Sequence, residues 1–198
     1  MPRIEDISDY LRGIWLLVLG DRKGLSWLDN SADGVLRSFL AFVWCLPAMA
    51  IGWSGARMYY LANMPDGTPA GVIFVLKLLL VDIAAWGVPL LLVAILSRAL
   101  GYTDILADVI VATNWLSVPA LYASAFPSAI SLVIPGSGPS MALVALLILM
   151  FAIAATYRLL KTIVGDHWLL ATTLTMLFIL PSLMVADLLQ RALGVTPV

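Results

Sequence analysis

The chain has 198 residues, of which 62% are hydrophobic and only 12% are charged, and its mean hydropathy is +1.02. Soluble domains carry about 25% charged residues, so this composition excludes an ordinary soluble fold. The formal net charge of −1 provides no basic surface for nucleic acid, which is therefore excluded as a partner. The long apolar runs predict an all-α polytopic bundle with the lipid bilayer as its surroundings.

Residues 1–31 form the first predicted unit, a cytoplasmic helix and loop. Apolar residues recur at steps of three and four: Ile4, Ile7, Leu11, Ile14, Trp15 and Val18. Charged residues occupy the remaining face: Arg3, Glu5, Asp6, Asp9 and Arg12. This spacing predicts an amphipathic helix over 4–19 that is too short to span. It would lie in the headgroup plane with Trp15 directed inward, or pack on the protein's own spans.

Residues 32–198 form the second predicted unit, with five transmembrane spans. The apolar runs place these spans at about 35–53, 69–100, 105–134, 141–160 and 167–189. Each run is near or above the roughly 20 residues that a membrane-crossing helix needs. Proline and glycine punctuate the connections, above all at 64–69 and 135–140.

Lysine and arginine are distributed unequally between the two sides of this topology. One side collects Arg3, Arg12, Arg22, Lys23, Arg37, Arg98, Arg158 and Lys161, and the other only Arg57 and Arg191. The positive-inside rule therefore predicts a cytoplasmic N-terminus and an outer C-terminus. Trp53 is assigned to the outer interface, where aromatic rings are enriched.

The second span contains two charged residues, Lys77 and Asp82. Five residues apart on a helix, they point about 140° away from each other, so each needs a different partner. Counting residues along the spans places Lys77 at the same outer depth as Asp187 in the fifth span, so these two could pair. The alternative is that Lys77 extends to the outer headgroups.

Asp82 lies deeper and close to Pro89, which disturbs its helix. Thr113 and Asn114 in the third span approach the same depth. A carboxylate, an amide and a loosened helix near the midplane are typical of an ion or proton pathway, but they also serve as contacts between helices. The candidate polar site is therefore Lys77, Asp82, Asn114 and Asp187.

Motifs for catalysis, nucleotides or metals are missing from the sequence. There is one histidine and one cysteine, and no HExxH, GxSxG or Walker motif. We therefore expect no cofactor, no metal and no enzyme activity.

The layout resembles the Yip/YIPF-like family of five-span membrane proteins. The similarity lies in the amphipathic N-terminus, the five spans, the Gly101–Tyr102 turn, the polar and proline residues of the third span, and the stretch 20–42. The Asp-Leu-Tyr-Gly-Pro signature of eukaryotic members is absent, so Rab-type partners are not implied. The resemblance implies a bacterial-type member, located in the bacterial inner membrane, with a non-enzymatic role in membrane organisation.

Two functions therefore follow from the sequence. The favoured one is a non-enzymatic scaffold or accessory subunit that binds other membrane proteins or a second copy of itself. The alternative is a small ion- or proton-coupled transporter that uses Asp82 and Asn114.

Overall fold

Every regular element in the described part of the chain is helical. The computed structural model describes residues 4–134 and 136–196, with no strand among them. The elements are α1 (Ile4–Leu19), η1 (Arg22–Trp27), α2 (Ala32–Ser38), α3 (Ala41–Ala62), α4 (Val72–Leu96), η2 (Thr103–Ile105), α5 (Leu106–Val133), α6 (Gly138–Val164) and α7 (Trp168–Ala192). The prediction of an all-α fold is confirmed.

Within residues 4–134 and 136–196, five helical segments are long and apolar enough to cross a membrane. They are Ala32–Ala62, which combines α2 and α3, then Val72–Leu96, Thr103–Val133, Gly138–Val164 and Trp168–Ala192. The expected number of spans is confirmed, and these segments are compatible with an integral membrane protein.

The first span is longer than the sequence predicted, and it is broken. Instead of covering 35–53, it runs through α2 and α3 with a break at Phe39 and Leu40. Around the break, the N–H groups of Leu40 and Val43 bond to carbonyls three residues back, at 2.9 and 3.0 Å. A tight turn of this kind redirects the helix without leaving its amides unpaired. Trp53 consequently lies inside the span rather than at its end.

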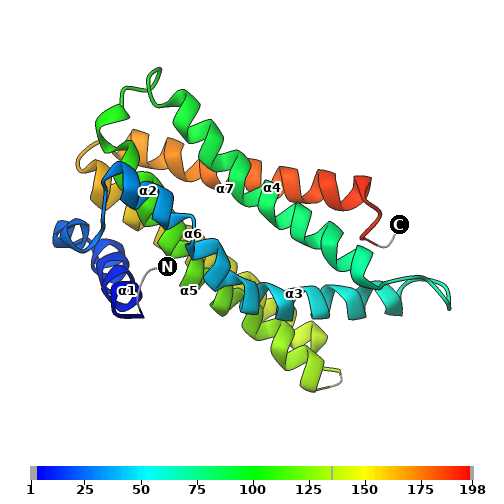
Figure 1. Cartoon of the computed structure of the whole chain (residues 1–198). Helices are drawn as coiled ribbons and strands as arrows, with labels where there is room; N and C mark the ends of the chain where they lie inside the picture. Colours follow the sequence, from blue (N-terminus) through cyan, green and yellow to red (C-terminus); the bar gives the residue numbers. More distant parts are fainter. Residues whose placement is uncertain (1–3, 135, 197–198) are drawn as a thin grey trace.

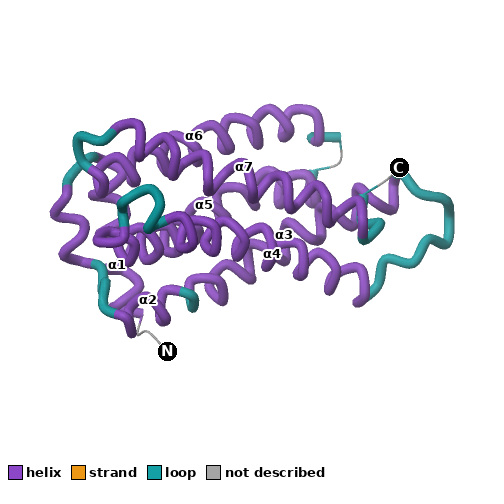
Figure 2. The backbone as a smooth tube through the Cα atoms, turned by 90° about the horizontal axis from the view of Figure 1, so that it is seen from above, coloured by secondary structure: helices purple, strands orange, loops and turns teal. Residues whose placement is uncertain are grey.

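The spans are arranged as two helix pairs joined by a fifth helix. The pairs α3–α5 and α4–α7 pack most extensively, and α6 contacts both α5 and α7. In contrast, α3 and α4 are consecutive in the sequence but contact each other at few positions. Figure 1 shows the spans close together near α1 and diverging toward the other end, and Figure 2 gives the view at 90°.

The larger hydrophobic core lies at the end of the bundle that carries α1. It contains buried side chains from α1, the start of α3, the first half of α5 and the end of α6, including Leu17, Ala41, Trp115 and Leu160. A second, smaller cluster at the other end consists of Tyr60, Ala70, Phe74, Leu78 and Val195. Apolar packing therefore concentrates around α1.

The helix α1 packs against α6 and η1, and to a smaller extent α5. Ile14 and Leu17 face these elements and are almost fully buried, whereas Trp15 on the other side is 59% exposed. Gly13 lies directly against Gly24 of η1: a Cβ atom added at Gly13 would lie 2.8 Å from the Gly24 carbonyl oxygen. The two glycines therefore permit a close backbone approach that larger residues would prevent.

Arginine side chains connect separate elements at this end of the bundle. The Arg158 guanidinium on α6 donates from Nε to the Val18 carbonyl at 2.7 Å and from Nη2 to the Leu19 carbonyl at 3.1 Å. Arg22 of η1 donates to the Ile163 carbonyl at 3.2 Å. Each arginine satisfies carbonyls at a helix C-terminus, where no amide of the same helix is available.

Candidate binding cavity between the spans

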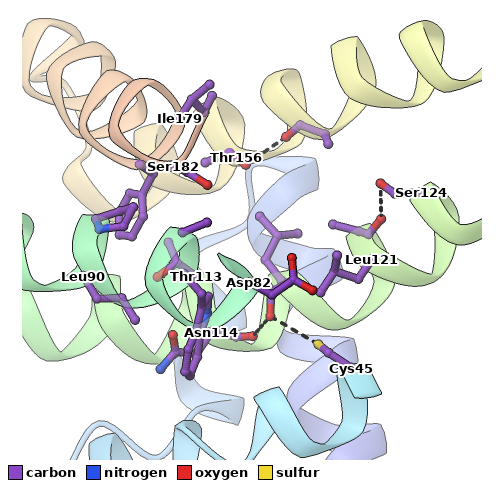
Figure 3. Close-up of a pocket in the computed structure, with 18 of the residues that line it drawn as sticks. Cys45, Asp82, Leu90, Thr113, Asn114, Leu121, Ser124, Thr156, Ile179 and Ser182 are labelled. Atoms are coloured by element: carbon purple, nitrogen blue, oxygen red, sulfur yellow. Dashed lines mark hydrogen bonds between the residues drawn. The ribbon is translucent and has the colours of Figure 1, made fainter. Parts of the chain in front are cut away.

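A cavity of about 340 Å³ lies between the two helix pairs. All five spans line it: Phe42, Cys45 and Met49 from α3; Asp82, Ala85, Trp86, Pro89 and Leu90 from α4; Thr113, Asn114, Leu116, Ser117, Ala120, Leu121 and Ser124 from α5; Leu149, Ala152, Ile153 and Thr156 from α6; and Phe178, Ile179, Ser182 and Leu183 from α7. Figure 3 shows this site. Its volume is within the range of small-molecule sites, about 300 to 1,000 Å³.

Among the described residues that line the cavity, Asp82 alone carries an ionisable acidic or basic side chain other than cysteine. Its Oδ2 atom accepts a hydrogen bond of 2.7 Å from the indole Nε1 of Trp53 on α3. This bond joins α3 and α4, which otherwise contact each other little. A carboxylate has several acceptor positions on its two oxygens, so one indole N–H leaves acceptor capacity for a further donor.

Four hydroxyl side chains in the cavity wall donate their protons to their own helices. The acceptors are backbone carbonyls: Val109 for Thr113 at 2.7 Å, Asn114 for Ser117 at 2.6 Å, Ala120 for Ser124 at 2.9 Å and Ala152 for Thr156 at 2.8 Å. A hydroxyl that donates in this way keeps its oxygen lone pairs. The wall therefore presents acceptors to a ligand.

Asn114 also contributes to the cavity wall, but its amide nitrogen is engaged elsewhere. The side chain is fully buried, and Nδ2 donates to Ser38 Oγ of α2 at 2.8 Å. Within the described part of the chain, its Oδ1 has no hydrogen-bond partner. Asn114 thus fixes α5 to the broken first span, and the structure brings it to the same cavity as Asp82 and Thr113.

Lys77 and Asp187 do not line the cavity, and the predicted pair between them is not formed. Lys77 Nζ donates to the Leu193 carbonyl at 2.7 Å, at the end of α7. Asp187 Oδ1 instead accepts from Arg191 Nε at 2.9 Å, one turn along the same helix. The flexible lysine reaches a helix C-terminus, where carbonyls lack amide partners and a positive charge is favourable.

Sequence reasoning missed Trp53 and the contributions of α6 and α7. Trp53 was assigned to the outer interface because the first span was expected to end there, but its indole N–H bonds to Asp82. Thr156 and Ser182 line the cavity from α6 and α7. No spacing in the sequence indicates which serine or threonine of α6 and α7 lines a cavity shared with a carboxylate of α4.

No protein-family model, curated protein or solved structure matches this chain. The resemblance to the Yip/YIPF-like family therefore stays a prediction.

Proposed function

We propose that this protein is a small membrane transporter that moves a cation, with Asp82 as the binding carboxylate. The observation that carries the proposal is the cavity of about 340 Å³ between all five spans, with one carboxylate and no basic residue in its wall. An unneutralised charge is costly within a bilayer, so ionisable groups there commonly mark ion pathways. Asn114, also in the wall, fixes the position of α5.

The proposal includes an orientation in a bacterial inner membrane. The N-terminus would be cytoplasmic and the C-terminus outside. Support comes from the lysines and arginines of the described chain: apart from Lys77 within α4, seven lie at the α1 end and two at the other end. The seven are Arg12, Arg22, Lys23, Arg37, Arg98, Arg158 and Lys161, and the two are Arg57 and Arg191, near the ends of α3 and α7. This is the asymmetry that the positive-inside rule associates with the cytoplasmic side.

The experiment is a cation flux measurement in proteoliposomes. Wild type, Asp82→Asn and Asp187→Asn would be reconstituted, and uptake of H⁺, Na⁺ and small organic cations would be compared with empty liposomes. We expect at least one flux in wild type, a loss of at least tenfold in Asp82→Asn, and no change in Asp187→Asn, whose carboxylate is outside the cavity. Equal flux in all three proteins would overturn the assignment to Asp82.

Absence of any flux would favour the scaffold or accessory role that the sequence suggested first. That role predicts co-purification of a stoichiometric membrane partner, or a stable homo-oligomer, from native membranes in mild detergent. Because Asp82 would then serve only as a contact between α3 and α4, a properly folded Asp82→Asn variant should retain the partner.

A further inference from the structure

We propose that the ligand of this cavity is an organic ammonium ion that carries N–H donors on an apolar, preferably aromatic, body. The inference rests on the proposed function, because it specifies the cation that the site binds. It follows from three properties of the wall: its single negative charge, its hydrogen-bond acceptors and its aromatic rings.

The charge of the wall matches a single positive charge on the ligand. Asp82 is the only ionisable carboxylate among the lining residues, and no lysine, arginine or histidine accompanies it. The Trp53 indole is neutral, so its hydrogen bond at 2.7 Å does not compensate the charge. A carboxylate in an apolar environment is stabilised by a cation that also hydrogen-bonds to it.

Three hydroxyl groups of the cavity wall can accept hydrogen bonds from a ligand but have no proton left to donate to it. Thr113, Ser117 and Thr156 give their protons to backbone carbonyls, so their oxygens can only accept from a ligand. An ammonium group has up to three N–H donors. Its donors would therefore find acceptors in the Asp82 carboxylate and in these hydroxyl oxygens.

The remaining wall is apolar and includes three aromatic residues, Phe42, Trp86 and Phe178. The Phe42 and Trp86 rings pack together with their centroids 5.0 Å apart. Aromatic faces attract organic cations and exclude strongly hydrated ions. The rings also offer apolar surface to the ligand body, in a space of about 340 Å³ that is far larger than a dehydrated metal ion.

The donor set does not suit a divalent metal ion. Ca²⁺ takes six to eight oxygen ligands, usually with several carboxylates. Among residues 4–134 and 136–196, no three His, Cys, Asp or Glu side chains are grouped so that they could bind a metal. The single carboxylate and the apolar wall therefore favour an organic ion over a divalent cation.

The test is equilibrium binding of phenethylammonium to the purified full chain in detergent. Propylbenzene, a neutral molecule of the same shape, serves as the ligand control. We expect saturable binding of phenethylammonium, at least tenfold tighter than that of propylbenzene. Asp82→Asn should weaken the binding of phenethylammonium at least tenfold and leave the affinity for propylbenzene unchanged. Asp187→Asn should change neither affinity. Equal affinity for the two ligands, or displacement of phenethylammonium by equimolar Na⁺, would overturn the inference.

A second variant covers the possibility that Asp82→Asn does not fold. Trp86→Leu keeps the carboxylate and should reduce the preference for phenethylammonium over propylbenzene severalfold, because it removes an aromatic face. An unchanged preference would contradict the role of the ring. The failure of this inference and the failure of the proposed function can be distinguished. Charge-dependent binding of phenethylammonium without any flux would overturn the transport function alone. Asp82-dependent flux of Na⁺ or H⁺ without binding of phenethylammonium would overturn only the assignment of the ligand class.

Discussion

The end of the bundle that carries α1 and the end that carries the last turn of α7 are held together differently. At the α1 end, a large apolar core is combined with a close glycine contact and two arginines that bond to helix C-termini. At the other end, five buried residues form a separate cluster, and Lys77 connects α4 to the end of α7. Figure 1 shows the spans diverging toward this second end.

This difference explains where the cavity can form. Helices fixed at one end and diverging at the other leave space between them, because side chains of ordinary size no longer meet across the bundle. The two helix pairs are linked there by α6 and by the Trp53–Asp82 hydrogen bond. The cavity borders the larger core, because Cys45 and Met49 belong to both.

The largest effect is expected for Gly13→Ala at the α1 end. A Cβ atom there would lie 2.8 Å from the Gly24 carbonyl oxygen and 2.9 Å from the Trp27 Cβ. The overlap should lower the free energy of unfolding by about 1 to 3 kcal/mol, measured by SDS-induced unfolding in mixed micelles. Gly87→Ala in α4 is the matched control, because a Cβ there meets nothing within 4 Å. Equal stability of the two variants would contradict the glycine contact.

A smaller loss in the free energy of unfolding is expected for Arg158→Met. The variant retains the apolar stem but removes the bonds to the Val18 and Leu19 carbonyls. The cost should be about 1 to 2 kcal/mol, since the donor is charged but partly exposed to solvent. Hydrogen exchange should accelerate in the last turn of α1 while α7 is unaffected. Lys161→Met, which removes a charge three residues further along α6, serves as the control and should leave α1 protected.

Lys77→Met tests the opposite end and should have a weaker effect. It removes one hydrogen bond to the Leu193 carbonyl and a favourable charge at a helix C-terminus, together about 0.5 to 1 kcal/mol. Faster hydrogen exchange should be confined to the last turn of α7. If Lys77→Met lowered the free energy of unfolding more than Arg158→Met does, the view that the α1 end is the more firmly fixed would be contradicted.

The number and order of the spans could be predicted because length and apolarity are properties of single segments. The separate partners of Lys77 and Asp82 also followed from helix geometry along one element. In contrast, the pairing of α4 with α7 rather than with α3 depends on packing between segments that are distant in the chain. The Lys77–Asp187 prediction failed for a different reason. The two helices do pack together, but only depth was counted, whereas Lys77 bonds to the Leu193 carbonyl and Asp187 to Arg191 on its own helix.

The cavity itself could be predicted only in part. Asp82, Thr113 and Asn114 could be placed at one depth by counting residues, and all three line it. The Trp53 donor was missed because α3 continues to Ala62, beyond the predicted end of the first span at residue 53.

The smallest effect is expected in the loop that leads into α2, at the α1 end. Ser31 caps α2 by accepting from the Gly34 N–H at 3.0 Å, and its own hydroxyl and N–H donate to Asp29 Oδ1 at 2.6 and 3.1 Å. These bonds favour the ionised carboxylate and lower the pKa of Asp29. Because its folded-state pKa is depressed, the stabilisation is present above the unfolded pKa of about 4 and is lost as pH falls through the folded value.

The pKa of Asp29 can be measured from the ¹³C chemical shift of its carboxyl group during an acid titration. In wild type, the midpoint should lie below that of an unstructured aspartate. Ser31→Ala should raise it, because the hydroxyl donor to Asp29 is removed. Loss of the helix cap should cost about 0.5 kcal/mol, the low end for such caps, because Ser31 is exposed to solvent. An Asp29 midpoint that Ser31→Ala leaves unchanged would show that the hydroxyl does not bond to this carboxylate, and this part of the α1 end would then be held less firmly than the geometry indicates.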